Sequence, residues 1–479
     1  MLRCVAFTYS RYSRCAPTWY WSLNAGSIRE ARLRAYRDRC DFLSRASSSR
    51  GMEVLDLAKG HPDPSLLPRQ VLADACTVGA SEMREGTIDG LRYGSAPTGS
   101  SVFLQELADF VKRQCPGEKV PRAGDGMLVT NGVSHGLELA AGVFARRGEA
   151  VLVESPSYFL AMGIFESHGL EVVPVATDAE GMLVDAIEGI LDARAAGSPP
   201  VRLIYTIPTG HNPTGCVLSA PRRRRLVDIA RRRSLLILAD EVYHMLDWHP
   251  PGSRPPRMVC FDDAYADVSG GVRVEVMQKD SCTKVEEPSL PAPVVVSVNS
   301  FTKILAPGLR IGWIEAAPEL VNQLAKRGYL VSGGCVASFA TEVVLKHALR
   351  SRSVDAALRV LVSTFRDRAR RLASALIEVG LPPLVEAKGG YFVWVPLGVD
   401  AQAVLEIAKS RFAVAFMPGA RCDASGDSEL AQNARLCFAW LQDEQLEEGA
   451  RRLAAAVKAA KESAFEPASK RSRKLELDL

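Results

Sequence analysis

The chain has 479 residues, of which 47% are hydrophobic and 24% are charged, so it can bury a large apolar area and divide into two domains. Its formal net charge is +4, but residues 1–40 carry eight arginines against two acidic residues, Glu30 and Asp38, which leaves the remainder slightly negative. A body with so little charge offers no basic face to nucleic acid, and no apolar run is long enough to span a bilayer. We therefore expect neither nucleic acid nor a membrane as a partner.

The cysteines and the two chain ends give indications of the cellular compartment in which the protein is found. Eleven cysteines are scattered without a CxxC pair or a zinc-site spacing, which predicts free thiols in a reducing environment. Residues 1–29 contain arginines, serines and aromatics but no acid, a composition typical of an organelle-targeting segment; an extension that targets nothing is the alternative. We expect a cytoplasmic or mitochondrial protein. The run KRSRK at 470–474 indicates either a nuclear signal or a solvated end.

The middle of the chain alternates between two kinds of pattern. Between residues 125 and 316, short β-rich apolar runs are separated by longer helical patterns. This alternation predicts an α/β domain with a mainly parallel, doubly wound sheet covered on both faces. The expected strands are MLVT from 127, AVLVE from 150, VRLIYT from 201, LLILAD from 235, VVVSV from 294 and RIGWIEA from 310.

The pattern changes after Pro318. A helical region from about 319 to 379 precedes the strand YFVWVPL, another helix and the strand-like RLCFAWL, which together predict a smaller α+β domain. The proline-rich stretch 249–293 indicates an irregular connection. The expected domains are an N-terminal extension at 1–40, an arm joining the small domain at 41–75, a large cofactor domain at 76–318, a small domain at 319–465 and a tail at 466–479.

Two of the predicted strands lead into loops suited to a ligand, because ligands of open α/β sheets bind at the carboxyl ends of strands. In TNGVSHGLELAAGVF, the Gly132 turn leads to a helix beginning near Val133 and Ser134, whose free N–H groups form a phosphate site. An ordinary βα turn is the alternative. In LIYTIPTGHNPTG, Asn212 lies where its side chain reaches the sheet edge, although NPTG alone is a turn signal.

Two further strands end in charged residues. LLILADEVYHML delivers Asp240 at a strand end, with Tyr243 three positions later; a desolvated aspartate needs a cationic or N–H partner, and helix capping is its alternative role. In SFTKILAPGLRIGW, Ser300, Lys303 and Arg310 follow a strand, and solvated surface charges are the alternative there.

The four loops together supply the groups that pyridoxal 5'-phosphate requires. That cofactor needs a lysine to bond its aldehyde, an acid at its ring nitrogen, donors to its phenolic oxygen and an anchor for its phosphate. A lysine, an aspartate, an amide with a hydroxyl, and a helix N-terminus with an arginine meet those needs. The sequence therefore predicts a pyridoxal-phosphate enzyme.

The chain resembles the fold-type I pyridoxal-phosphate enzymes, the class I and II aminotransferases, over roughly residues 41–462. The NPTG and D-x-x-Y motifs occur in the family's order. Within the family, the chain is most similar to the branch of 2-aminoadipate and kynurenine aminotransferases. The motif S-x-x-K-x-x-x-P-G-x-R-x-G is matched in full by Ser300, Lys303, Pro307, Gly308, Arg310 and Gly312.

The resemblance implies a role for each motif residue. Lys303 would bond the cofactor and then move a proton, as nucleophile and general base in turn. Asp240 would keep the ring nitrogen protonated, and Asn212 and Tyr243 would hold the phenolic oxygen. The phosphate would be held by Arg310, Ser300 and the helix start at Val133, Ser134 and His135.

The resemblance also extends to residues outside these motifs. Tyr158 would stack on the cofactor ring, with a core tyrosine as the alternative. Tyr93 would reach the cofactor phosphate of a neighbouring subunit, which implies a homodimer with shared sites. At this point the sequence departs from the family, because Gly99 follows Tyr93 one position later than usual and FLQEL replaces the usual helix start. The substrate α-carboxylate would be bound by Gly60, Asn212 and Arg435.

The activity implied by the resemblance is transamination of an L-amino acid, such as 2-aminoadipate, kynurenine or an aromatic amino acid, with a 2-oxo acid such as 2-oxoglutarate. A β-lyase acting on cysteine conjugates is an alternative, because it uses the same machinery. A cofactor-sensing regulator is another, but it needs a winged helix-turn-helix segment for which residues 1–40 are too short. Which amino acid serves as the donor depends on the walls of the substrate pocket, which we expect near residues 61–67 and 330–340.

Overall fold

The computed structural model describes residues 52–88, 91–94, 96–121, 125–250, 252–265, 291–334, 338–426 and 429–465. They belong to one compact unit, Ser47–Leu479. The predictions for the 1–40 extension, the KRSRK tail and most of the 249–293 connection lie outside the described residues.

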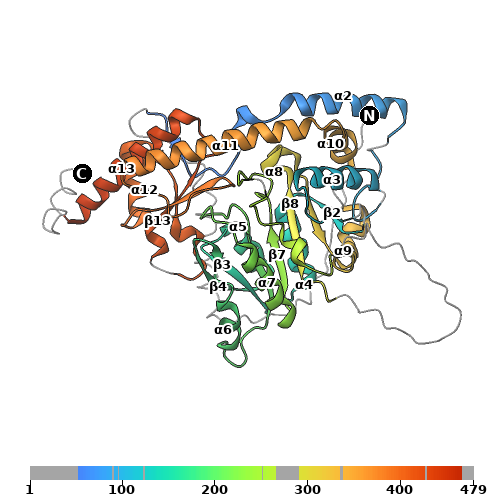
Figure 1. The fold of residues 1–479 in the computed structure, drawn as a ribbon, viewed down its shortest axis with the longest axis horizontal. Coiled ribbons are helices and arrows are strands. Elements are labelled where there is room, and N and C mark those ends of the chain that lie inside the picture. Colours follow the sequence, from blue (N-terminus) through green and yellow to red (C-terminus); the bar gives the residue numbers. More distant parts are fainter. Residues whose placement is uncertain are drawn as a thin grey trace, which may run out of the picture. The chain divides into compact units, whose positions relative to one another are not determined.

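A sheet of eight strands crosses the larger part of the unit (Figure 1), in the order β2-β9-β8-β7-β6-β3-β4-β5. Strands β3, β4, β6, β7 and β8 are parallel, whereas β9 is antiparallel to β2 and β8, and β5 to β4. The predicted α/β class with a mainly parallel sheet is confirmed. The strands are β2 Met127–Thr130, β3 Ala150–Ser155, β4 Glu171–Asp178, β5 Gly181–Met182, β6 Val201–Thr206, β7 Leu236–Asp240, β8 Val295–Ser300 and β9 Gly312–Ala316.

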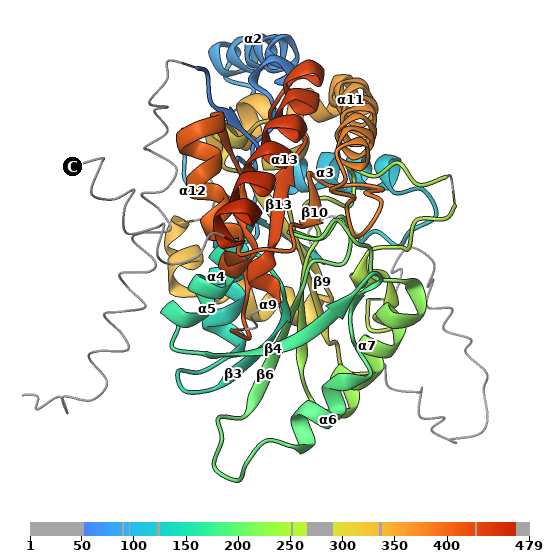
Figure 2. The same ribbon diagram turned by 90° about the vertical axis from the view of Figure 1, so that its left-hand side faces the viewer.

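The central strands are apolar because helices cover both faces of the sheet. Every residue of β3, β7, β8 and β9 is buried, as expected for doubly covered strands. Figure 2 shows α4 and α5 on one side of the sheet and α7 on the other. The helices of this part are α3 Ser101–Gln114, α4 Gly132–Phe144, α5 Phe159–Ser167, α6 Ala186–Asp192, α7 Ala220–Arg232, α8 Phe301–Ile304 and α9 Pro318–Ala325.

All six strands predicted in this region are present, but β4 and β5 were not predicted. β4 lies next to the edge strand, contains Pro174 and alternates between buried and exposed residues. A proline is tolerated near a sheet edge but weakens the sequence signal for a strand. β5 has two residues, too few to form a pattern.

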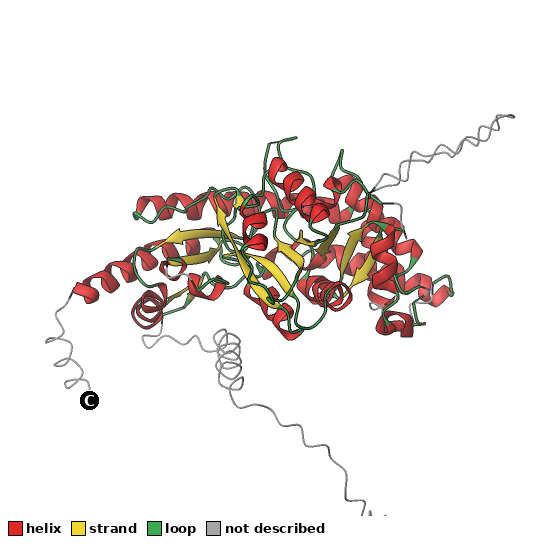
Figure 3. Ribbon diagram, turned by 90° about the horizontal axis from the view of Figure 1, so that it is seen from below, coloured by secondary structure: helices red, strands yellow, loops and turns green. Residues whose placement is uncertain are grey.

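The second group of elements is built around small sheets. An antiparallel sheet has the order β10-β13-β12, and β1 pairs in parallel with β11, so the N-terminal arm joins the C-terminal part of the chain. Figure 3 shows strands in the interior with helices around them. These elements are β1 Leu55–Asp56, β10 Phe392–Pro396, β11 Val414–Ala415, β12 Met417–Pro418, β13 Asn433–Cys437, α12 Ala401–Phe412 and α13 Asp443–Phe465.

The region predicted as helical from 319 to 379 consists of several helices. After α9 come η4 Leu330–Gly334, η5 Phe339–Leu345, α10 Lys346–Arg350 and α11 Ser353–Glu378. None of the helices in the described ranges combines the length and the apolar composition needed to cross a bilayer.

Helix α2, Arg69–Glu85, packs against η5 and α10. Gly79 permits this approach, because a Cβ atom at this position would lie 1.9 Å from the Val343 carbonyl oxygen. The contact is therefore made between backbones, with no room for a side chain.

Replacing Gly79 by alanine should lower the free energy of unfolding by about 1–3 kcal/mol, because the added methyl group forces the two helices apart. Urea unfolding measures this change. Gly189→Ala is the matched control, since it lies in a helix with nothing within 4 Å of its Cβ position, and it should leave stability equal or slightly higher. Equal stability of Gly79→Ala and wild type would contradict the close contact.

Candidate active site

The carboxyl ends of β6, β7 and β8 lie side by side, because these strands are neighbours and parallel. Each end delivers one of the predicted side chains: Asn212 after β6, Asp240 at the end of β7 and Lys303 after β8. The topology of the sheet thus gathers residues that are far apart in the sequence at one edge.

Lys303 lies in the short helix α8, whose first turn is capped by Ser300. Its Nζ atom donates to the Gly60 carbonyl oxygen at 2.8 Å and lies 5.1 Å from the centre of the Tyr391 ring. Burial lowers the pKa of the Lys303 amine to about 8, with Arg435 and Arg310 adding to the effect and Cys437 and Asp240 opposing it. A larger share of the amine is therefore neutral at physiological pH.

Asp240 is buried at the end of β7, with 3% of its surface exposed. Its Oδ2 atom accepts a hydrogen bond from the Tyr205 hydroxyl at 2.9 Å, whereas Oδ1 has no partner among the described residues. Burial raises the pKa of the Asp240 carboxyl to about 6, against the hydrogen bond from Tyr205. A buried carboxylate oxygen without a partner is costly, and it fits a ligand that donates a hydrogen bond at this point.

Aromatic side chains enclose the space around Asp240. Tyr243 is buried, and its ring centre lies 5.3 Å from that of Tyr391 and 6.1 Å from that of Phe392. Burial and the nearby Asp240 charge raise the pKa of Tyr158 to about 12. Tyr158 immediately precedes α5. The structure therefore brings both predicted tyrosines, Tyr158 and Tyr243, into the surroundings of Asp240.

The predicted phosphate cradle lies between α4 and the loop after α8. Gly132 has φ +78°, and a Cβ atom on it would lie 2.9 Å from Arg310 Nη2. Arg310 Nη2 donates to the Asn131 carbonyl oxygen at 3.1 Å. Among the described residues no side chain caps the start of α4, so the N–H groups of its first turn, Val133 to His135, are available to an anion beside an exposed guanidinium.

Ser300 caps α8, and its Oγ donates to Thr302 Oγ1 at 2.8 Å. Its buried Oγ accepts from Thr302 N at 3.0 Å and lies 3.1 Å from the Ile311 carbonyl oxygen. Thr302 Oγ1 lies 3.4 Å from Arg310 Nη1. The structure thus places the Thr302 hydroxyl beside the guanidinium, while Ser300 caps α8.

Arg435 in β13 reaches across to the sheet edge. It donates from Nη1 to Asn212 Oδ1 at 3.0 Å and from Nη2 to the Ala58 carbonyl oxygen at 2.7 Å. The Cζ atom lies 4.2 Å from the centre of the Phe392 ring, and Nε has no partner among the described residues. Gly60 fits closely here, because a Cβ atom on it would lie 2.9 Å from Phe392 Cζ.

Tyr93 does not join this group. It is 86% exposed and its ring packs against Gly333, at a hollow of about 360 Å³ that is also lined by Ser338 and Lys346. The predicted contact of Tyr93 with a cofactor involves a second subunit, so this exposed position neither supports nor contradicts it.

Sequence reasoning missed several residues of this space. Tyr205 was hidden inside a predicted strand, and its alignment with Asp240 depends on the register that pairs Tyr205 with Leu238. Thr302, next to Lys303, carried a signal in its proximity to the lysine motif. Phe392 and Tyr391 come from β10 and its approach, and only the meeting of the two parts of the fold brings them to Lys303.

The residues present fit pyridoxal 5'-phosphate. The unpartnered Asp240 Oδ1 suits its ring N–H, the α4 start with Arg310 suits its phosphate, and the Lys303 amine lies where it can bond the aldehyde. The fold and these groups together define a fold-type I pyridoxal-phosphate enzyme.

Comparison with known proteins identifies the family. The profile described as "Aminotransferase class I and II" matches residues 55–453, and the chain belongs to this family. It is 27% identical to aromatic-amino-acid aminotransferase 1 of Thermococcus litoralis, covering 85% of this chain and 88% of that protein. It is 29% identical to the 2-aminoadipate transaminase of Thermus thermophilus, covering 85% and 90%.

A solved structure extends the likeness to three dimensions. LysN, the alpha-aminoadipate aminotransferase of Thermus thermophilus, was solved as a complex with N-(5'-phosphopyridoxyl)-L-leucine. It superimposes on this chain with a TM-score of 0.68 at 28% identity, covering 85% of this chain and 92% of that one. The protein is therefore a pyridoxal-phosphate-dependent aminotransferase, as the sequence predicted.

The lowered pKa of Lys303 predicts how cofactor capture depends on pH. Only the neutral amine attacks an aldehyde, so the rate at which the cofactor-free protein bonds added pyridoxal 5'-phosphate should rise with pH and level off above a midpoint near 8. Stopped-flow absorbance measures this rate. A rate that continues to rise through pH 10 would show that the amine keeps its ordinary pKa.

Proposed function

We propose that this aminotransferase transfers the amino group of a 2-aminoadipate-like or aromatic L-amino acid, kynurenine included, to a 2-oxo acid such as 2-oxoglutarate. The observation that carries the proposal is the meeting of Lys303 and Arg435 in one space. The Arg435 charge contributes to the lowered pKa of Lys303, so an amine that handles protons lies close to a guanidinium that suits a carboxylate.

Each side chain has a task in this reaction. Pyridoxal phosphate, when bound, supplies a ring that accepts the electrons released at the substrate α-carbon. Lys303 would bond the cofactor aldehyde and, once the substrate amine has displaced it, would take up the proton of the substrate α-carbon as a free amine. Asp240 would accept a hydrogen bond from the ring nitrogen, and Asn212 and Tyr243 would donate to the phenolic oxygen.

Arg435 orients the substrate. Its present partners, the Asn212 side chain and the Ala58 carbonyl oxygen, are neutral, so its charge is available to the α-carboxylate of an amino acid. A planar guanidinium holds a carboxylate through two parallel hydrogen bonds, which fixes the α-carbon relative to Lys303. The Gly60 carbonyl oxygen accepts a hydrogen bond of 2.8 Å from the Lys303 amine and keeps the amine in place.

The choice of donors is supported by the residues flanking Gly60. Lys59 Nζ lies 3.6 Å from the centre of the Trp440 ring, and the His61 ring lies 6.3 Å from it. Burial lowers the pKa of His61, and the charges of Lys303 and Lys59 lower it further. A cation and an indole ring close to Lys303 suit a side-chain carboxylate or an aromatic ring, in agreement with the names of the two relatives.

The proposed assembly is a homodimer with shared sites. Apolar side chains are exposed close to the α4 cradle: Tyr329, whose ring lies 5.7 Å from that of His135, is 55% exposed, and Tyr93 packs beside Gly333. Contiguous exposed apolar surface favours a protein partner. The exposed residues of this surface are Leu91, Tyr93, Tyr329, Val331 and Phe339.

The proposed reaction is tested by absorbance with a panel of amino donors. Wild-type protein with pyridoxal 5'-phosphate should show a visible band that 2-aminoadipate or an aromatic donor converts to the pyridoxamine form. Lys303→Ala should lose the band and at least about 10³-fold of the turnover, while the exposed-lysine variant Lys388→Ala retains both. Conversion by neither donor class would contradict the substrate proposal, and ammonia release from a cysteine conjugate would instead indicate a β-lyase.

Shared sites are tested by mixing subunits. Tyr93→Phe should weaken cofactor affinity about tenfold, the loss of one hydrogen bond to a charged phosphate. A mixed dimer of Tyr93→Phe and Lys303→Ala subunits should regain one site of wild-type affinity, because the intact Lys303 then meets the intact Tyr93 of its partner. Absorbance titration counts such sites. If no mixed dimer regains wild-type affinity, Tyr93 does not act across an interface.

A further inference from the structure

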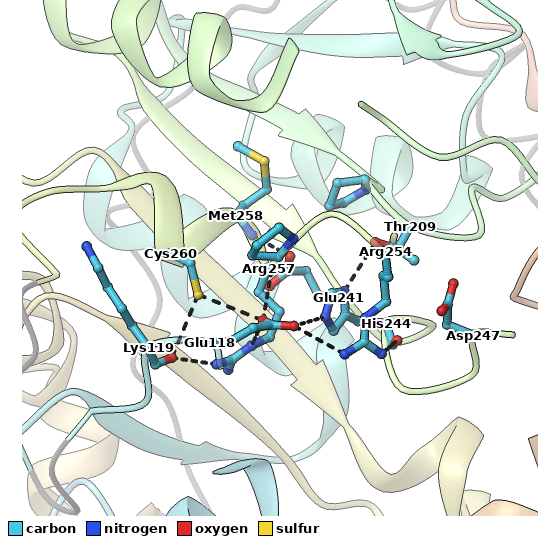
Figure 4. Close-up of polar contacts among 12 residues, drawn as sticks. Glu118, Lys119, Thr209, Glu241, His244, Asp247, Arg254, Arg257, Met258 and Cys260 are labelled. Carbon is cyan, nitrogen blue, oxygen red and sulfur yellow. Dashed lines mark hydrogen bonds and ion pairs between the residues drawn. The ribbon is translucent and has the colours of Figure 1, made fainter. Parts of the chain in front are cut away.

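Asp240 at the end of β7 and Tyr243 in the loop that follows lie in the active site, while the side chain after Tyr243, His244, enters a buried cluster of charged groups (Figure 4). Glu118, between α3 and β2, is the centre of this cluster. Its Oε1 atom accepts from His244 Nε2 at 2.9 Å and from Arg254 Nη2 at 3.2 Å. Its Oε2 atom accepts from both N and Nε of Arg257 at 2.9 Å.

The contacts of His244 indicate which of its two ring nitrogens carries the proton. Thr209 Oγ1 accepts from Arg223 Nη2 at 2.8 Å, so its own proton is free to be donated to His244 Nδ1, 3.3 Å away. Nδ1 is then the acceptor, and Nε2 carries the proton given to Glu118. Burial lowers the pKa of His244 to about 4, although Glu118 acts in the opposite direction. The imidazole is thus neutral and bonded at both nitrogens.

His244 connects two loops that enter the active site. Thr209 lies in the loop after β6, three residues before Asn212, and His244 directly follows Tyr243. The backbone is held as well, because Arg254 Nη1 donates to the His244 carbonyl oxygen at 2.9 Å. A shift of His244 would therefore change the spacing between Tyr243 and Asn212.

Metal binding is the other chemistry that this cluster suggests. Cys115, Glu118 and His244 have potential ligand atoms within 4.8 Å of one another. However, burial raises the pKa of the Cys115 thiol to about 12, which opposes the thiolate a metal needs. The Glu118 oxygens already accept four hydrogen bonds, two guanidinium groups among their donors. A cation there would displace satisfied partners, so the contacts favour a positioning role.

We propose that His244, held between Thr209 and Glu118, is a positioning residue that sets how Tyr243 and Asn212 meet the phenolic oxygen of the cofactor. Through them it sets the pH at which the cofactor bonded to Lys303 loses its proton. Weaker donation to the phenolic oxygen leaves more negative charge on it, and the proton is then held more tightly. The proposal rests on the cofactor placement given under the proposed function.

The test titrates the visible band of the cofactor-loaded enzyme against pH. His244→Gln keeps a donor toward Glu118 but loses the contact with Thr209. Thr209→Val removes the same contact from the other side, together with the hydrogen bond from Arg223 Nη2. Each variant should raise the midpoint by about one unit, and the double variant should show the same shift as either single one. The groups that face Lys303 stay unchanged in all variants: Cys437, Arg435, Asp240 and Arg310.

Cys260→Ala is the matched control, because Cys260 Sγ contacts Glu118 at 3.8 Å without joining the two loops. It should leave the midpoint unchanged. The proposal would be overturned if the variants bind cofactor and unfold at a lower temperature but keep the wild-type midpoint. If His244→Gln fails to fold, the midpoint of Thr209→Val decides between these outcomes. A wild-type enzyme without a pH-dependent band would instead contradict the cofactor placement.

Discussion

Burial of charge at the carboxyl ends of β6, β7 and β8 is the constraint on which the rest of the active site depends. Lys303 and Asp240 are brought out of water by the same strand ends, and burial moves the pKa of each toward neutrality, to about 8 and about 6. A lysine and an aspartate in water would both remain fully charged at neutral pH. The sheet therefore produces a proton-exchanging lysine by its topology, since no short-range contact in the sequence would bring these two groups together.

The N-terminal arm completes the site through its backbone. The Ala58 carbonyl oxygen accepts a hydrogen bond from Arg435, and the Gly60 carbonyl oxygen accepts one from Lys303. One short segment thus holds these two basic side chains of the active site. The arm is itself fixed, because the buried Asp63 side chain accepts from Arg368 Nη2 at 2.7 Å. Neutral carbonyl partners hold both side chains in place, which leaves the Arg435 charge for an incoming carboxylate and the Lys303 amine for the cofactor aldehyde.

The sequence was informative where a local pattern decides the structure. All six predicted strands of the large sheet formed, because each is a mainly apolar run, buried throughout except at Arg202 in β6. The same runs predicted that Lys303, Asp240 and Asn212 would meet, since each follows a strand end. The register between strands, which places Tyr205 under Asp240, depends on pairing across the sheet and has no local signal. The contacts of Arg435 with Asn212 and Ala58 depend on how the two groups of elements pack, which a single sequence does not encode locally.

Two carboxylates, Glu118 and Asp240, differ in how fully their oxygens are hydrogen-bonded. This difference separates the residues that support the active site from those that take part in the reaction. Glu118 has all its acceptor positions engaged by His244, Arg254 and Arg257, so it gains nothing from a ligand and stabilises the loops that surround it. Asp240, which is more deeply buried, retains one oxygen without a partner among the described residues, a cost that a bound ring N–H removes. A buried polar atom is affordable in a folded protein only when something satisfies it. Because the Asp240 oxygen lies at the strand ends that also carry Lys303 and Asn212, it suits the ring N–H of the cofactor, whereas the satisfied Glu118 stabilises the loops beside it.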